Sequence, residues 1–173
     1  MKVMIIGYSG SGKSTLCRKI ADVYQIEPLF MDTIHWLPGW KERDRDEEIS
    51  LLKEFLSKNE SWVIDGNYSK VLHKERCELA DRIIFMDFNR FSCLKRALKR
   101  SKEYRFRTRE SMTEGCPEKI DMEFVQWILY KGRSREIKDR YRDICSSFNG
   151  KCIIIRNQKQ LDELYERIDG GLL

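Results

Sequence analysis

Short apolar runs alternate with amphipathic stretches along the chain. Five runs have the length and composition of buried strands, at residues 2–6, 27–32, 62–65, 82–87 and 151–155. Apolar residues between and after them recur at three- and four-residue spacing, which predicts helices at about residues 15–23, 43–56, 69–77, 91–102, 118–130, 133–148 and 161–168. Such alternation of strands and helices is typical of an α/β domain built on a parallel sheet.

Polar residues close three of these predicted strands. Asp32, Asp65 and Asp87 each stand at a carboxyl end. Ligands of open α/β sheets bind beyond these ends, so we expect the three carboxylates to border one crevice. Each aspartate also has a simpler interpretation, as a helix N-cap or a turn residue.

The link between the first strand and the first helix has the composition of a phosphate-binding loop. Residues 7–14 match the pattern G-x-x-x-x-G-K-S. Its glycines allow a tight turn that directs backbone N–H groups at phosphate oxygens, and the helix N-terminus adds positive partial charge. The residues predicted to bind the nucleotide are Gly7, Ser9, Gly10, Ser11, Gly12, Lys13, Ser14 and Thr15. Lys13 is expected to reach the β- and γ-phosphates of ATP, and the Ser14 hydroxyl to ligate Mg²⁺.

Composition narrows the class of protein. A length of 173 residues fits one domain, residues 1–173, and a net charge of +5 suits anionic ligands without singling out nucleic acid. No apolar run approaches the roughly 20 residues of a membrane span, and the first predicted strand begins at the N-terminus; both features favour a cytoplasmic protein. The six cysteines form no C-x-x-C pair and there are only two histidines, so we expect reduced thiols and no zinc site.

The apolar periodicity fades at about residues 102–117, where basic residues are frequent. Such a segment is expected to bury little apolar surface and to act as a mobile lid. Arg96 and Arg100 precede it on one helix face. Three interpretations of the basic residues are open: a lid that closes arginines over a phosphate, a nucleic-acid patch in which Tyr104 and Phe106 stack on bases, or a solvated basic face.

Four segments together resemble a known family. They are residues 4–15, residues 32–36 (Asp-Thr-Ile-His-Trp), residues 62–68 (Trp-Val-Ile-Asp-Gly-Asn-Tyr) and residues 80–84. Over nearly its whole length the chain resembles the bacterial topology modulation protein (FlaR-like) family, which is related to adenylate kinase and to small-metabolite kinases such as shikimate kinase. The resemblance implies a three-layer α/β/α P-loop kinase fold with a five-stranded parallel sheet of order 2-3-1-4-5, a mobile lid, and phosphoryl transfer from ATP with Mg²⁺.

Residue roles follow from the same resemblance. The implied strand order places Asp65 beside the phosphate loop, where it would complete the metal site with Ser14. The catalytic set that the resemblance implies is Lys13, Asp32, Arg96, Arg100 and Arg133, and the acceptor-binding set is Asp32, His35, Trp36 and Asn67. Whether Asp32 acts as a base or only orients the acceptor is left open, because positioning and electrostatics dominate this chemistry.

The sequence indicates the chemical class of the phosphoryl acceptor but not its identity. Asn67 and Tyr68 stand where adenylate kinase has Pro-Arg after Asp-Gly, so an arginine that grips a nucleoside monophosphate is missing. This departure argues against adenylate kinase activity itself. Residues 33–40 are expected to form an aromatic-rich loop around a Pro-Gly turn, and its two tryptophans with His35 favour a ring-containing or partly apolar acceptor.

The sequence therefore predicts an ATP- and Mg²⁺-dependent kinase for a small metabolite or nucleotide. The alternative is a nucleotide-dependent regulatory protein that contacts nucleic acid through the basic lid. A plain NTPase is a third interpretation. No membrane partner is expected, and monomer and dimer are both left open.

Overall fold

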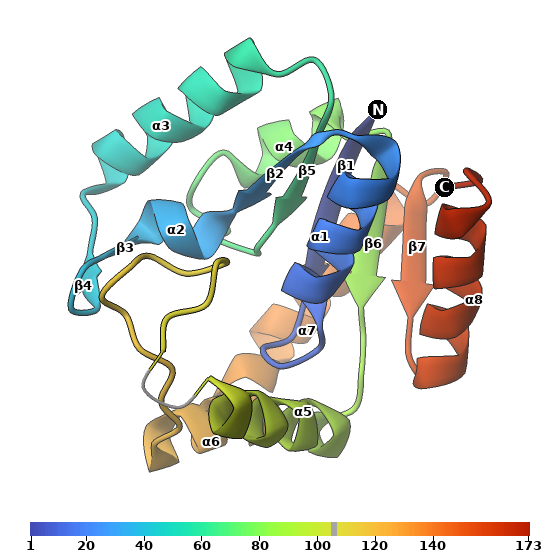
Figure 1. The fold of residues 1–173 in the computed structure, drawn as a ribbon. Helices are drawn as coiled ribbons and strands as arrows, with labels where there is room; N and C mark the ends of the chain where they lie inside the picture. The colour runs from blue at the N-terminus through green and yellow to red at the C-terminus, as the bar shows by residue number, and fades with distance from the viewer. Residues whose placement is uncertain (105–106) are drawn as a thin grey trace.

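The computed structural model describes residues 1–104 and 107–173 (Figure 1). The strands are β1 (Lys2–Gly7), β2 (Glu27–Phe30), β3 (Trp36–Leu37), β4 (Lys41–Glu42), β5 (Trp62–Asp65), β6 (Arg82–Met86) and β7 (Cys152–Ile155). The helices are α1 (Lys13–Tyr24), α2 (Met31–His35), α3 (Arg45–Lys58), α4 (His73–Leu79), α5 (Arg90–Glu103), α6 (Met122–Leu129), the 3₁₀ turn η1 (Lys131–Arg133), α7 (Arg135–Ser147) and α8 (Gln158–Asp169). Phe106, a candidate for base stacking, lies outside the described residues. None of the described helices combines the length and apolar composition that crossing a membrane requires.

Five parallel strands form the central sheet in the order β2-β5-β1-β6-β7. Along the chain these are the second, third, first, fourth and fifth strands of the sheet, so the predicted order 2-3-1-4-5 is confirmed. The labels skip two numbers because β3 and β4 form a separate antiparallel hairpin. The central strand β1 is apolar after Lys2, and its residues 3–6 have no exposed surface, because helices cover both faces of the sheet.

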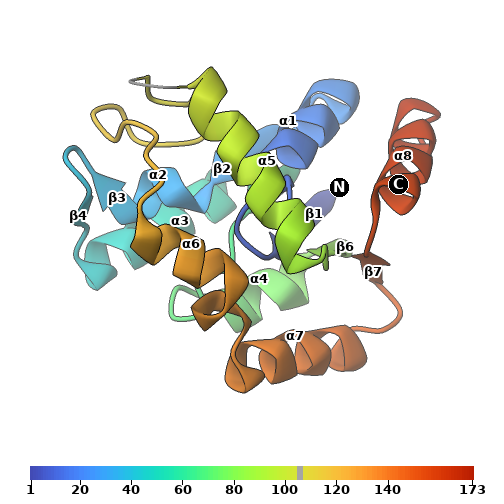
Figure 2. The same ribbon diagram turned by 90° about the horizontal axis from the view of Figure 1, so that it is seen from below.

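Helices on both faces of the sheet produce the three-layer fold (Figures 1 and 2). α1 and α8 lie on one face, and α4 and α7 lie on the other. Their apolar stripes supply the core: Leu16 and Ile20 of α1, and Leu164 and Ile168 of α8, are at most 2% exposed. α5 and α6 cross the carboxyl ends of the strands, below the arrowheads in Figure 1. They therefore cover the edge of the sheet where ligands are expected.

The second strand is shorter than expected. β2 ends at Phe30, and the next five residues form the short helix α2. Asp32 therefore lies in the first turn of a helix, and the prediction that it ends a strand is wrong. The apolar run looked like a strand, but Met31 and Ile34 are three residues apart and are both buried from one side of α2.

The aromatic segment after α2 forms a β-hairpin instead of a loop. β3 and β4 pair residues 36–37 with residues 41–42. The turn between them contains Gly39 with φ +77° and Trp40 with φ +62°. A tryptophan in this left-handed region costs conformational energy, so contacts around the hairpin must hold it there.

The predicted lid is partly docked on this hairpin, contrary to the expectation that it buries little surface. Among the described residues of the segment, those that are 7% exposed or less are Ser111, Met112 and Cys116. The Cys116 thiol donates to the Leu37 carbonyl at 3.3 Å, and the Thr113 hydroxyl donates to the Trp36 carbonyl. The second half of the lid segment is therefore tied to β3, on the side of the sheet opposite to β7.

Candidate active site

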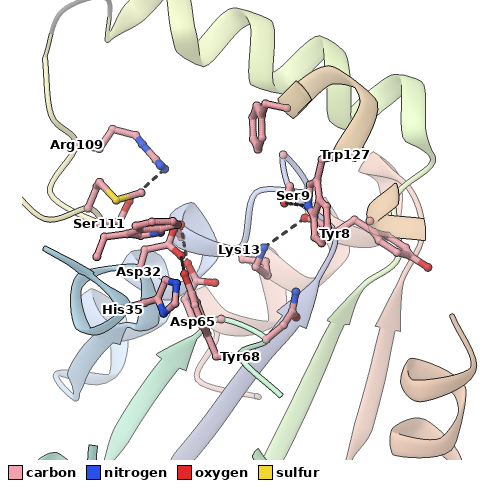
Figure 3. Close-up of a pocket in the computed structure, with 18 of the residues that line it drawn as sticks. Tyr8, Ser9, Lys13, Asp32, His35, Asp65, Tyr68, Arg109, Ser111 and Trp127 are labelled. Atoms are coloured by element: carbon pink, nitrogen blue, oxygen red, sulfur yellow. Dashed lines mark hydrogen bonds between the residues drawn. The ribbon is translucent and has the colours of Figure 1, made fainter. Parts of the chain in front are cut away.

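The phosphate loop, residues 8–12, joins β1 to α1 at the carboxyl ends of the strands (Figure 3). Gly10 and Gly12 have φ of +76° and +101°, which a residue with a side chain rarely adopts. A Cβ on Gly10 would also lie 2.4 Å from the Cys93 carbonyl oxygen. Gly12 begins α1 without a side-chain cap, so the first N–H groups of the helix remain available to an anion.

Lys13 reaches over this loop. Its Nζ donates to the Tyr8 carbonyl oxygen at 3.3 Å, so the ammonium group is folded back toward the cavity above the loop (Figure 3). Six of the eight residues predicted to bind nucleotide line that cavity: Ser9, Gly10, Gly12, Lys13, Ser14 and Thr15. The structure thus brings most of the predicted phosphate site together.

Gly7 and Ser11, the other two predicted nucleotide ligands, do not line the cavity. Gly7 is the last residue of β1, and a Cβ there would lie 2.6 Å from the Met86 carbonyl oxygen. Ser11 has no exposed surface, and its N–H donates to the Tyr8 carbonyl at 3.1 Å. Both residues shape the loop through packing and backbone geometry, and their predicted contact with the nucleotide stays a prediction.

The cavity above the loop is large enough for two small ligands. Its volume is about 1510 Å³, whereas a typical site for one small molecule measures about 300–1,000 Å³. Figure 3 shows two halves on either side of Lys13: Trp127 with Ser9 on one side, and Asp32 with Arg109 on the other. Trp127 is 44% exposed, and its Nε1 donates to the Ser9 hydroxyl at 3.2 Å.

Ser14 and Asp65 form a pair that fits a magnesium ion. The Ser14 hydroxyl donates to Asp65 Oδ2 at 2.6 Å. Asp65 is 6% exposed, and its other oxygen, Oδ1, is buried without a partner among the described residues. Burial raises the pKa of this carboxyl group, although the nearby Lys13 opposes the shift. A buried carboxylate oxygen without a donor, beside a hydroxyl, is a hard-oxygen environment of the kind that Mg²⁺ occupies together with phosphate oxygens.

Asp87 is placed differently from Asp65. It does not line the cavity, and its Oδ2 lies 3.6 Å from Nε of Arg156. No cluster of three or more histidine, cysteine or acidic residues capable of holding a metal is present in residues 1–104 and 107–173. A metal at Ser14 and Asp65 would therefore need oxygen ligands from a nucleotide and water, which is the usual arrangement for Mg²⁺.

Aromatic and acidic residues line the half of the cavity on the Asp32 side of Lys13, which we call the aromatic half. Tyr68 donates from its hydroxyl to Asp32 Oδ1 at 2.6 Å, and burial together with Asp32 raises the pKa of Tyr68. His35 Nδ1 lies 2.5 Å from Oε1 of Glu48, a carboxylate that is only 4% exposed. The ring of His35 also packs edge-on against Trp36, with 4.6 Å between ring centroids. This half combines flat apolar surfaces with one carboxylate, Asp32, that retains an oxygen for a ligand.

Asn67, which is predicted to bind the acceptor, is bonded to the backbone in this structure. Its Oδ1 accepts a hydrogen bond from the Gly7 N–H at 2.9 Å, and its Nδ2 donates to the Gly7 carbonyl at 2.8 Å. Both polar ends of the side chain are thus paired with the backbone of Gly7. Asn67 ties the loop after β5 to the start of the phosphate loop; it also lines the cavity, and its predicted contact with the acceptor stays a prediction.

Arg96 and Arg100 both line the cavity, and both already have protein partners. Arg96 Nη1 donates to the Ser11 carbonyl at 2.6 Å, and its guanidinium lies 3.8 Å from the centroid of the Phe88 ring. Arg96 therefore braces the phosphate loop. Arg100 Nε donates at 2.8 Å to Glu118, a residue to which the sequence pattern assigned no role in the site.

Arg133 does not line the cavity, and its predicted catalytic role stays a prediction. Its guanidinium lies 3.7 Å from the centroid of the Tyr8 ring. Nη2 donates to the Phe88 carbonyl at 2.8 Å, and Nε donates to the Ile128 carbonyl at 3.1 Å. The residue joins η1 to the base of the phosphate loop and so supports the site from outside.

Arg76 is a further residue that the sequence did not single out. It has no exposed surface, and its guanidinium donates to four backbone carbonyls, those of Gly66, Asn67, Tyr68 and Val71. Burial lowers the pKa of Arg76 to about 10. The four bonds hold the loop that carries Asn67 and Tyr68. No periodicity distinguishes this arginine from the exposed basic residues around it.

Comparison with known proteins identifies the fold. No protein-family model matches the chain, and no curated protein matches its sequence. A shikimate kinase from Acinetobacter baumannii in complex with shikimate has a similar structure, with 96% of this chain and 89% of the other covered, a TM-score of 0.58 and 19% identity. A gluconokinase from Sinorhizobium meliloti 1021 is similar over 99% of this chain and 90% of its own, with a TM-score of 0.54 and 17% identity. The narrower resemblance to topology modulation proteins finds no support in these matches. The chain has the three-layer α/β/α fold of these two kinases, as predicted.

Proposed function

We propose that this protein is a Mg²⁺-dependent kinase that transfers the γ-phosphoryl group of ATP to a small metabolite or nucleotide. The observation that carries the proposal is the 2.6 Å hydrogen bond between Ser14 and Asp65, at the phosphate loop of a two-part cavity. It joins the loop hydroxyl to a buried carboxylate whose second oxygen has no donor among the described residues. The fold shared with two kinases supports the same class of reaction, by analogy.

In this proposal the phosphates of ATP bind to the first N–H groups of α1 and to Lys13. Ser14 and Asp65 hold Mg²⁺, which when bound neutralises charge on the β- and γ-phosphates. Lys13 exchanges its contact with the Tyr8 carbonyl for a phosphate oxygen. The protein's own contribution is thus mainly electrostatic and positional, as in other phosphoryl transfers.

The acceptor occupies the aromatic half of the cavity. Tyr68 holds Oδ1 of Asp32, so the free Oδ2 accepts a hydrogen bond from the acceptor hydroxyl and aligns it toward Lys13. Rings of His35 and Trp36 supply flat surface for an acceptor that is ring-containing or partly apolar. Holding both reactants in line in this way accounts for a large part of the rate in two-substrate reactions.

A screen for stimulated ADP release tests the proposal. MgATP and the protein are mixed with nucleosides, nucleoside monophosphates and hydroxylated metabolites, shikimate among them. We expect one class of compound to raise ADP release in the wild type and not in Lys13→Ala. Lys19→Ala is the matched control, because Lys19 lies on the same helix but pairs with Asp169 outside the cavity. If no compound raises ADP release above the rate of ATP hydrolysis, the plain NTPase interpretation replaces the kinase.

The nucleic-acid alternative has less support. Arg100 and Arg109 are 26% and 10% exposed and pair with Glu118, whereas a phosphate backbone needs exposed cations. Binding of a DNA duplex that falls steeply between 50 and 200 mM salt, and that persists in Lys13→Ala, would favour this alternative.

A further inference from the structure

Three charged side chains, of which only Arg100 is more than 10% exposed, form an ion cluster on the lid side of the cavity. They are Arg100 at the end of α5, and Arg109 and Glu118 in the segment that follows. Nη2 of Arg100 lies 2.7 Å from Glu118 Oε1, and Nε of Arg109 lies 2.8 Å from Oε2. Glu118 is 5% exposed, so a single carboxylate holds two guanidinium groups largely away from bulk water.

The cluster carries an excess of positive charge. Two guanidinium groups face one carboxylate, which leaves a net charge of about +1 because arginine stays protonated in proteins. Burial and the neighbouring Arg109 lower the pKa of Arg100, while Glu118 opposes that shift. A buried charge is costly unless it is paired, so this arrangement favours an anion in the adjoining cavity. All three residues line that cavity.

Some guanidinium N–H groups of the cluster remain available to such an anion. Glu118 Oε1 accepts a hydrogen bond from Arg100 Nε at 2.8 Å and lies 2.7 Å from Arg100 Nη2. Glu118 Oε2 lies 2.8 Å from Arg109 Nε, an ion-pair contact without hydrogen-bond geometry. Nη1 of Arg109 makes only a long contact of 3.4 Å with the Ser111 hydroxyl, and its Nη2 has no hydrogen-bond partner in the described chain. Figure 3 shows the Arg109 side chain extending into the cavity on the side of Asp32. The outer edge of the guanidinium is therefore presented to a ligand.

We propose that Glu118 is a positioning residue that fixes Arg100 and Arg109 as a preformed site for the oxygens of the transferring phosphoryl group. Without it, the two like charges would repel each other and both long side chains would lose their orientation. The carboxylate binds the inner nitrogens and leaves the outer ones to the ligand, so it need not be displaced when the phosphoryl group arrives. This inference rests on the proposed kinase function.

Aluminium fluoride provides the test, because with MgADP it imitates a phosphoryl group in transfer. Calorimetry measures the affinity for MgADP alone and with aluminium fluoride, which we expect to tighten binding in the wild type. Glu118→Gln should change the affinity for MgADP less than twofold but reduce the tightening roughly tenfold to a hundredfold, the worth of one charged hydrogen bond. Glu118→Asp keeps the charge and should retain more of the tightening. The matched control is Glu114→Gln, at an exposed position of the same segment.

A double-mutant cycle separates positioning from a purely structural role. In an Arg109→Ala background, Glu118→Gln should alter the tightening by a smaller factor than it does alone, since one of its two targets is gone and only Arg100 remains. An undiminished effect there, or an equal loss of MgADP affinity and thermal stability in the single variant, would overturn the proposal. So would a wild type whose affinity for MgADP does not respond to aluminium fluoride. Lys13→Ala in the same assay should weaken MgADP binding itself; if it does not, the proposed function fails independently of Glu118.

Discussion

At the scale of the residue, the site depends on which strand-end carboxylate stands beside the phosphate loop. Asp65 contacts Ser14, whereas Asp87 lies near Arg156 and outside the cavity. The two aspartates look alike in the sequence, since each follows an apolar run. Strand order alone does not distinguish them, because β5 and β6 both pair with β1. The register does: Asp65 lies opposite Ile5, whereas Asp87 follows Met86, the residue opposite Gly7. That register could not be predicted from the pattern.

Asp65→Asn should therefore damage the metal site more than Asp87→Asn does. Asparagine keeps the size of the side chain but loses the charge, so the Mg²⁺ concentration for half-maximal ADP release should rise roughly tenfold or more. Asp87→Asn should stay within about twofold of the wild type. A titration of rate against Mg²⁺ measures both, and a larger effect at Asp87 would show that the metal lies elsewhere.

A second residue-scale prediction concerns His73, at the start of α4. Burial, with the positive charges of Arg76 and Arg140, lowers its pKa to about 4. The unfolded chain, with a histidine pKa of about 6.5, binds this proton first, so the free energy of unfolding falls as the pH drops from about 6.5 to about 4. The loss should reach up to about 3 kcal/mol, since one pKa unit is worth about 1.4 kcal/mol.

His73→Gln removes that titration. Urea denaturation at pH 7 and pH 4 should show a smaller loss of unfolding free energy in the variant than in the wild type. Losses that are equal in both proteins would mean that His73 is accessible to protons in the folded state.

At the scale of the element, the lid segment shows what a pattern cannot reveal. The absence of periodicity correctly indicated a segment without a helix over residues 107–117. It did not indicate burial, because Thr113 and Cys116 are held by a hairpin whose own formation was unexpected. Side-chain bonds to backbone carbonyls of β3 leave no repeating signature in a sequence.

Hydrogen exchange should divide the lid segment into two parts. Residues 111–116 should exchange slowly without ligand, because Met112 and Cys116 donate backbone hydrogen bonds and are buried. MgADP with aluminium fluoride should add protection mainly at residues 107–110, next to the ion cluster, and little in α8. Thr113→Ala, which removes a bond to the Trp36 carbonyl, should speed exchange at Gly39 and Cys116. Protection of residues 107–110 by a DNA duplex and not by the nucleotide complex would contradict the kinase assignment.

At the scale of the whole molecule, most of the fold could be predicted and part of the site could not. Alternating strands and helices, with the glycine loop at the first junction, indicated the α/β class and the edge of the sheet where that loop lies. The sequence did not reveal which arginine side chains point into the cavity and which point away from it. Arg96, Arg109 and Arg133 face different partners because packing between distant elements decides their orientation, and their spacing along the chain does not.

Nucleotide binding should stabilise the molecule as a whole. A ligand that binds only the folded state at 100 times its Kd adds about 2.7 kcal/mol to the free energy of unfolding. For a chain of this length that amounts to a rise in Tm of roughly 5–10 °C. Calorimetric melting with saturating MgATP should show this rise in the wild type and in Lys19→Ala, and a much smaller one in Lys13→Ala. Equal rises in all three proteins would place nucleotide binding outside the phosphate loop.

The distribution of tryptophans makes the protein its own optical probe. Trp127 touches the phosphate loop through Ser9, whereas Trp36 and Trp40 stand in the aromatic half, 5.4 Å apart between ring centroids. Trp62 has no exposed surface and should contribute a constant emission. In Trp127→Phe, changes in fluorescence would report ligand binding only in the aromatic half. In a variant with Trp36 and Trp40 both replaced by Phe, they would report binding only in the nucleotide half. Rapid mixing of the two variants with each ligand would then reveal which of the two enters first, without any attached dye.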